Sequence, residues 1–175
     1  MALGRIKVHG HWTIEVRDPD GALKTHREFE NALVANSGPG AMVAILACFT
    51  AGNCPNMTNV LVWDVQLDGS PQPCTTQAFI DPLNPLAGTT TVPAPCLLQG
   101  PAQNYPLSAK PQGTTFVLSG AIAAGQNGTV ATVTTSLGIA GGPFPGGPFT
   151  AKTLPTPISV LAGQLIQVTV VYSFS

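Results

Sequence analysis

Charged side chains are scarce in this sequence and nearly missing from its C-terminal half. Asp, Glu, Lys and Arg make up 9% of the 175 residues, whereas a typical soluble domain has about a quarter. Beyond Asp81 there is no acidic residue, and the only basic ones are Lys110 and Lys152. Because charge normally keeps an exposed surface solvated, we expect this half to be covered by other chains.

The same scarcity argues against several classes of partner. The seven basic residues are balanced by eight acidic ones, so a broad nucleic-acid surface is not expected. No apolar run approaches the roughly 20 residues of a membrane span, and the longest, at 41–49, suits a buried helix. The first residues lack the apolar core of a signal peptide, so we expect synthesis in the cytoplasm.

Catalytic and metal-binding patterns are also missing. We find no Ser-His-Asp group, paired-carboxylate cleft or phosphate-binding glycine loop, and therefore expect neither an enzyme nor a cofactor. His9, His11 and His26 share a face of the predicted first hairpin with Glu28 and Glu30, a set that suits zinc or nickel. Ligands on flat strands rarely converge, so we interpret the set as a solvated face without a metal.

The cysteines lie in the middle third of the chain and are Cys48, Cys54, Cys74 and Cys96. No pair has the two-residue spacing of a zinc knuckle or a redox motif. They allow two disulfides, in any of three connectivities, or free thiols in a reducing compartment.

Apolar residues at every second position predict a hairpin over the first 34 residues, with a turn at 18–21. Pairing Val16 with Leu23 places Glu15 opposite Lys24, which gives one charged and one apolar face. A buried helix is predicted at 37–49 and a strand at 59–67. The region 71–111 is rich in proline, which blocks ladder hydrogen bonds, and is expected to be an extended arm or insertion.

The C-terminal half predicts more strands. A second hairpin is expected from the apolar alternation at 116–122 and 133–137, joined by a turn at 125–128. The tandem repeat at 141–150 is interpreted as a loop tip that presents two phenylalanines. A last strand at 164–175 carries alternating inward residues. The sequence therefore predicts a single all-β domain, an antiparallel β-sandwich (jelly-roll-like) with one short helix and a long Pro-rich arm.

Several apolar side chains are candidates for contacts with other subunits, because aromatic anchors in charge-poor surroundings are typical of interface centres. The candidates are Met42, Ile45, Phe49, Phe144, Phe149, Tyr172 and Phe174. Edge strands with little charge need covering, so closed symmetric homo-oligomers are expected, trimers among them.

Two parts of the chain resemble small virion structural proteins of tailed bacteriophages. The first comprises 12–21 (WTIEVRDPDG) and 31–36 (NALVAN); the second comprises 149–155 (FTAKTLP), 157–164 (PISVLAGQ) and 172–175 (YSFS). The resemblance implies a capsid decoration, minor capsid, neck or tail protein that binds major capsid or neck and tail subunits. It implies a protein made in the host cytoplasm that resides in the virion, and it carries over no catalytic residue.

The expected function is therefore structural and non-enzymatic. The main alternative is a subunit of an extracellular filament or surface layer, which would share the low charge and the Thr-rich strands. A carbohydrate-binding module would need clustered exposed aromatic residues, and the two Trp and two Tyr of this chain are far apart in sequence.

Overall fold

The structure is a computed structural model that describes residues 7–35, 61–70, 74–80, 108–112, 114–139 and 147–175. For 74–80 and a few strand ends it describes the backbone alone. The predicted helix at 37–49 and most of the predicted Pro-rich arm lie outside these ranges. Within them, no helix is long and apolar enough to cross a membrane.

The described residues form nine antiparallel strands in one sheet. The strands are β1 (Val8–Arg17), β2 (Leu23–Leu33), β3 (Leu61–Ser70), β4 (Cys74–Ile80), β5 (Ser108–Gln112), β6 (Thr115–Ala123), β7 (Gly128–Ile139), β8 (Gly147–Val160) and β9 (Leu165–Phe174). Their order across the sheet is β4-β3-β7-β8-β2-β1-β9-β6-β5. The predicted all-β, antiparallel class is confirmed.

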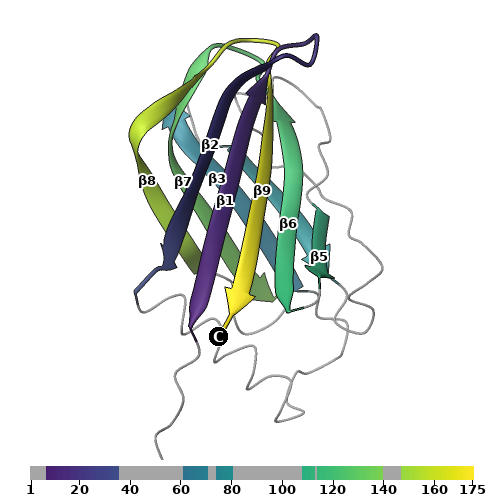
Figure 1. Ribbon diagram of the computed structural model, residues 1–175, viewed down its shortest axis with the longest axis vertical. Coiled ribbons are helices and arrows are strands. Elements are labelled where there is room, and N and C mark those ends of the chain that lie inside the picture. Colours follow the sequence, from purple (N-terminus) through teal and green to yellow (C-terminus); the bar gives the residue numbers. More distant parts are fainter. Residues whose placement is uncertain (1–6, 36–60, 71–73, 81–107, 113, 140–146) are drawn as a thin grey trace, which may run out of the picture.

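The sheet curls on itself so that its two halves face each other. Figure 1 shows β2, β1, β9, β6 and β5 as the nearer half, with β8, β7 and β3 crossing behind them. The edge strands β4 and β5 also contact each other. This curl gives the sheet one inner face, where the core lies, and one outer face.

The core is filled by the inward residues of both halves, as the period-two pattern predicts. The nearer half contributes Trp12, Ile14, Val16, Leu118, Ile122, Ile166, Val168, Val170 and Tyr172, and the far half contributes Trp63, Val65, Leu67, Val130, Val133, Leu137, Phe149, Leu154, Ile158 and Val160. Trp63 stands at the centre of an aromatic group, with ring centroids 5.1–5.5 Å from Phe116, Phe149 and Tyr172. The inward positions predicted for the last strand are confirmed except at Phe174, which is 45% exposed.

The first hairpin forms with the predicted faces but in a shifted register. Glu15 lies opposite His26, and not opposite Lys24 as predicted. One residue of the shift comes from the turn, because Arg17 pairs with Leu23 and not with Ala22. The other comes from a register irregularity between Val16 and Arg17, where Lys24 is an extra residue of β2. Because the shift equals two residues, every side chain keeps its predicted face.

The predicted second hairpin is wrong. β6 pairs with β5 and β9, whereas β7 pairs with β3 and β8, so the link between β6 and β7 crosses from one half of the sheet to the other. This link bonds to the next turn: Ala124 N–H donates to the Gln164 carbonyl at 2.8 Å, and the Asn127 side chain accepts from Ala162 N–H at 2.9 Å. Alternation predicts which side chains point inward but not which strand is the neighbour.

Two predictions about proline-rich segments also need correction. Residues 74–80 and 108–112 of the expected arm are strands β4 and β5, and both lie at sheet edges, where proline is tolerated. The second repeat of 141–150 begins β8 and pairs with β7, so it is not a loop tip. Phe149 within it is 1% exposed and belongs to the core.

A close approach of β3 and β7 explains one glycine. Asp68 pairs with Thr132 and Gly69 with Val130, so Ala131 is an extra, bulged residue in β7. A Cβ atom at Gly69 would lie 1.8 Å from the Thr129 carbonyl oxygen, which belongs to the backbone and cannot rotate away. Only glycine fits there without moving a strand.

We predict that Gly69→Ala destabilises the fold by more than about 3 kcal/mol, because the backbone of the bulge must shift. Gly21→Ala is the control: Gly21 has φ of 87°, but no atom lies within 4 Å of the position that a methyl group would take there, so the expected cost is only about 1 kcal/mol. Urea unfolding of both variants measures the difference. Equal costs would contradict the proposed steric role of Gly69.

Candidate functional site

β2 and β8 are neighbours in the sheet but pair over a short length. Ala32 pairs with Ala151 and Leu33 with Thr150, and Val34 N–H donates to the Phe149 carbonyl at 2.9 Å. We call the boundary between β2 and β8 the seam. Its closed end lies at these residues, and its open part runs along Leu23–Asn31, where β2 has no strand partner on this side among the described residues.

A buried hydrogen-bonded network lies at the closed end of the seam. The Thr150 hydroxyl lies 2.6 Å from the Asn31 side-chain amide, 2.7 Å from the Thr135 hydroxyl and 2.9 Å from the Tyr172 hydroxyl. Thr135 and Tyr172 also bond to each other. The four side chains are buried and come from β2, β7, β8 and β9, so the network joins both halves of the sheet.

The indole of Trp12 sets the direction of the network, because its N–H can only donate. With the Asn31 amide oriented to pair donors with acceptors, its oxygen accepts from Trp12 Nε1 at 2.5 Å and from Thr150 Oγ1 at 2.6 Å, and its nitrogen donates to the Gly10 carbonyl at 3.2 Å. Thr150 then has no further proton to donate, so it can only accept from Thr135 and Tyr172. The two protons of these residues serve two of the three contacts among the hydroxyls. Buried polar groups satisfied in this way favour one arrangement of the strands.

Gly10 makes room for this network. A Cβ atom there would lie 2.2 Å from the polar atom of the Asn31 side chain that faces Gly10, which is the nitrogen in this orientation, and 3.0 Å from the Tyr172 ring. The Asn31 side chain is held by its partners and cannot turn aside without breaking bonds.

The environment of Tyr172 keeps its hydroxyl protonated. Burial raises the pKa of Tyr172 to about 12, although hydrogen bonds from Thr135 and Thr150 act in the opposite direction. The phenol therefore serves as a neutral hydrogen-bonding group, which suits a structural role in the network.

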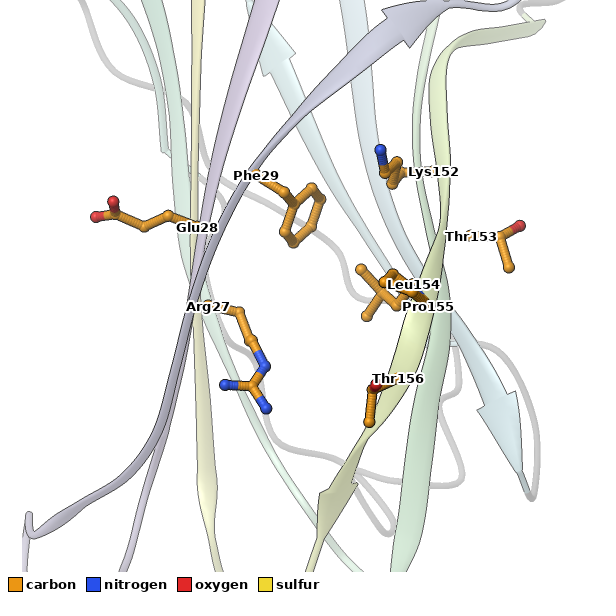
Figure 2. A pocket seen from close by; sticks show the side chains of 8 residues that line it. All are labelled: Arg27, Glu28, Phe29, Lys152, Thr153, Leu154, Pro155 and Thr156. Carbon is orange, nitrogen blue, oxygen red and sulfur yellow. The ribbon is translucent and has the colours of Figure 1, made fainter.

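A hollow of about 500 Å³ lies at the open part of the seam (Figure 2). Its lining residues are Arg27, Glu28, Phe29, Lys152, Thr153, Leu154, Pro155 and Thr156. Figure 2 shows Phe29 and Leu154 in the space between β2 and β8, with Glu28 pointing away on the other side of β2. Phe29 stacks on Trp12 with ring centroids 5.9 Å apart, so the apolar floor continues into the core.

The hollow opens because β8 bows away from its neighbours. Between Thr153 and Ile158 the β7–β8 register shifts, and the intervening residues include Pro155 and Pro157. Arg27 and Lys152 stand at the hollow, and neither forms an ion pair with an acid in the described part of the chain. The site thus combines an apolar floor, two cations and an open strand edge.

The outer face of the first hairpin carries linked charges. A hydrogen bond from Arg17 lowers the pKa of Glu15, and one from Gln164 lowers the pKa of Asp18. Lys24 bonds to Asp18 at 2.9 Å, which raises the pKa of Lys24. His26 contacts Glu15 on the neighbouring strand at 3.3 Å and Glu28 on its own strand at 3.2 Å. Among the residues described, no group of three or more His, Cys, Asp or Glu side chains could hold a metal ion.

The three predicted interface residues that the structure describes do not share one surface. Phe149 and Tyr172 are 1% and 0% exposed and contact each other inside the chain's own core, whereas Phe174 is exposed. Met42, Ile45, Phe49 and Phe144 lie outside the described residues. So do Cys48, Cys54 and Cys96 and the side chain of Cys74, and the cysteine pairing stays open.

The residues of the seam were missed by sequence reasoning, although a signal for them exists. The predicted hairpin faces already place Arg27 and Asn31 on the apolar side of the hairpin, where polar residues are unusual. Thr135 and Thr150 give no comparable signal, because threonine is common on both faces of strands.

We predict that Asn31→Ala destabilises the protein by about 3 kcal/mol, since it leaves the Trp12 indole N–H buried without a partner and removes the acceptor of the Thr150 hydroxyl. His11→Ala, an exposed position on the neighbouring strand β1, is the control and should change stability by less than about 0.5 kcal/mol. Urea unfolding followed by tryptophan fluorescence measures the free energy of unfolding of both variants. Equal changes would show that the hydrogen bonds of Asn31 do not stabilise the fold.

We predict an alkaline loss of stability that depends on Tyr172. Its folded pKa of about 12 exceeds the unfolded value of about 10, so its contribution is complete below pH 10 and is lost as the pH rises to 12. Relative to Tyr172→Phe, the wild-type free energy of unfolding should fall by about 1.4 kcal/mol per pH unit in that window. Parallel curves for the two proteins would show that Tyr172 does not titrate in this way.

Comparison with known proteins leaves the chain without a family. No family model matches the sequence, and neither a curated protein nor a solved structure matches it.

Proposed function

We propose that this protein is a non-enzymatic structural component of a tailed-phage virion. In this role it binds major capsid, neck or tail subunits and stabilises the particle as a capsid decoration, minor capsid, neck or tail protein. It is made in the host cytoplasm and assembled as a homo-oligomer. We further propose that the curled sheet is a jelly-roll-like sandwich. Its two layers are the two halves of the sheet, and a Pro-rich insertion lies between β4 and β5.

One observation carries the proposal: the outer surface of the C-terminal strands is almost uncharged. β6, β7, β8 and β9 contain a single charged residue, Lys152, and the outward positions of β9 include Gln167, Thr169 and Val171. Such a surface suits permanent burial against protein, because little desolvation of charge opposes the contact. The sequence resemblance to virion proteins is the second support.

The interior supports a scaffold role as well. The polar groups at the closed end of the seam are turned toward one another, and Tyr172 is protonated far above neutral pH. Their geometry serves rigidity and offers a substrate no approach. A subunit that holds its shape under load in a particle benefits from such a network.

The extracellular filament remains the second candidate because of the open edge of β2. Subunits of filaments can associate by adding a strand to an exposed sheet edge, and β2 has one along Leu23–Asn31 in the described structure. The two proposals differ in where the protein resides, and the following experiment separates them.

We predict that the protein is found in purified virions at a fixed copy number relative to the major capsid or tail protein. Quantitative mass spectrometry of particles identified from the genes adjoining its own measures this ratio. Because the contact surface is nearly uncharged, the protein should stay bound in about 1 M NaCl, where ion pairs are screened. Its absence from particles, with recovery in cell-surface filaments, would instead establish the alternative.

A further inference from the structure

The open edge of β2 presents backbone groups at alternate residues. Val34 N–H bonds across the closed end of the seam to β8. Because N–H and C=O groups alternate sides along a regular strand, the groups of His26, Glu28 and Glu30 point to the same side, toward the open part. Lys24 lies at the bulge beside Arg17, where this alternation is interrupted. The Arg27 guanidinium donates to the His26 carbonyl at 3.3 Å, which agrees with this direction.

The opposite side of the hollow is a poor place for a strand to add. β8 contributes Pro155 and Pro157 there, and proline has no N–H to donate. β2 has no proline between Leu23 and Leu33. An added strand would therefore pair with β2.

The order of charged residues along this edge is complementary to the same edge of a second, antiparallel copy. Along the outer face of β2 they run Lys24, His26, Glu28, Glu30, so basic groups come first and acidic groups follow. An antiparallel copy centred on Arg27 places Lys24 opposite Glu30 and His26 opposite Glu28, twice by symmetry. In other registers fewer opposite charges meet. Charges on an edge strand ordinarily keep strands apart, but this order favours one pairing.

We propose that two copies of this chain associate through β2, in an antiparallel pair centred on Arg27. The exposed backbone groups of His26 and Glu28 form the hydrogen bonds nearest the axis, and the symmetric charge pairs set the register. The inference deepens the proposed function by naming a surface through which its subunits associate.

Like charges meet at one point of this pairing, since Arg27 lies opposite its own copy on the inner face. The hollow beside Arg27 gives its side chain room to lie away from the axis, as its direction in Figure 2 indicates. Lys24 and His26 already contact Asp18 and Glu15 within the chain, whereas Glu30 has no ion-pair partner in the described structure. Glu30 is therefore the acid that gains most from the second copy.

Charge reversal tests the contact between copies. Glu30→Lys or Lys24→Glu alone should weaken dimerisation by roughly 10-fold or more in sedimentation equilibrium, because attraction becomes repulsion at two symmetric places. An equimolar mixture of the two single variants should form a heterodimer, since every pair is then complementary. Lys7→Glu, with the same charge change away from the edge, should leave dimerisation unchanged. Weakening that mixing does not relieve would overturn the proposal.

Cysteine cross-linking tests the register. Arg27→Cys should form a disulfide with the same residue of the second copy. The two residues at position 27 form a non-hydrogen-bonded pair, and the Cα atoms of such a pair lie about 4.5 Å apart. Thr25→Cys and Phe29→Cys should cross-link only when mixed. Peptide mass spectrometry distinguishes these bonds from those of the four natural cysteines.

The outcomes separate this inference from the proposed function. Oligomers of the Arg27→Cys variant that form no disulfide between their two copies of position 27 would overturn the β2 contact and leave a virion role standing. A monomer whose β2 amides are protected from exchange would show that another part of the chain covers the edge, and a monomer with unprotected amides would show an uncovered edge. Either result would overturn the inference, even if the protein is found in virions.

Discussion

The hydrogen-bonded network around Thr150 is the interaction on which the rest of the structure depends. The β2–β8 ladder is the only link in the described strand order between the half of the sheet that contains β1, β9 and β6 and the half that contains β7 and β3, and it consists of two residue pairs. Asn31, Thr135, Thr150 and Tyr172 reinforce that short ladder from inside the core. Without them, the short ladder and the apolar faces would hold the halves together, and apolar contact is not directional.

The short ladder also explains the open part of the seam. β8 must turn from its place beside β2 into the far half of the sheet, and the prolines at 155 and 157 accompany its departure from regular pairing. The result is a strand edge on β2 beside a hollow with an apolar floor. The closed end and the open part of the seam therefore both result from the change in direction of β8.

Much of the local structure could be predicted from the sequence, because period-two patterns report which side chains point inward. Trp12, Ile14, Leu118, Val133 and Val170 all lie inside, as predicted. Strand neighbours could not be predicted, since β6 and β7 have matching apolar faces whether they lie side by side or face each other across the core. The network escaped prediction for a related reason: Thr135 and Thr150 become partners only after a bulge and a register shift bring them together.

The functional account joins a rigid interior to a surface that favours contact. The charge-poor C-terminal strands provide a contact surface for neighbouring subunits, and the charged edge of β2 determines the orientation of the contact. Apolar area contributes affinity, whereas ordered charges and backbone hydrogen bonds select one geometry. A protein that takes a fixed place in an assembly needs both properties.

Amide hydrogen exchange along β2, measured as a function of protein concentration, tests this account most directly. The account predicts that the amides of His26 and Glu28 become protected as concentration rises, while the closed end of the seam is protected throughout. Exchange of the edge amides at one fast rate at every concentration would contradict it.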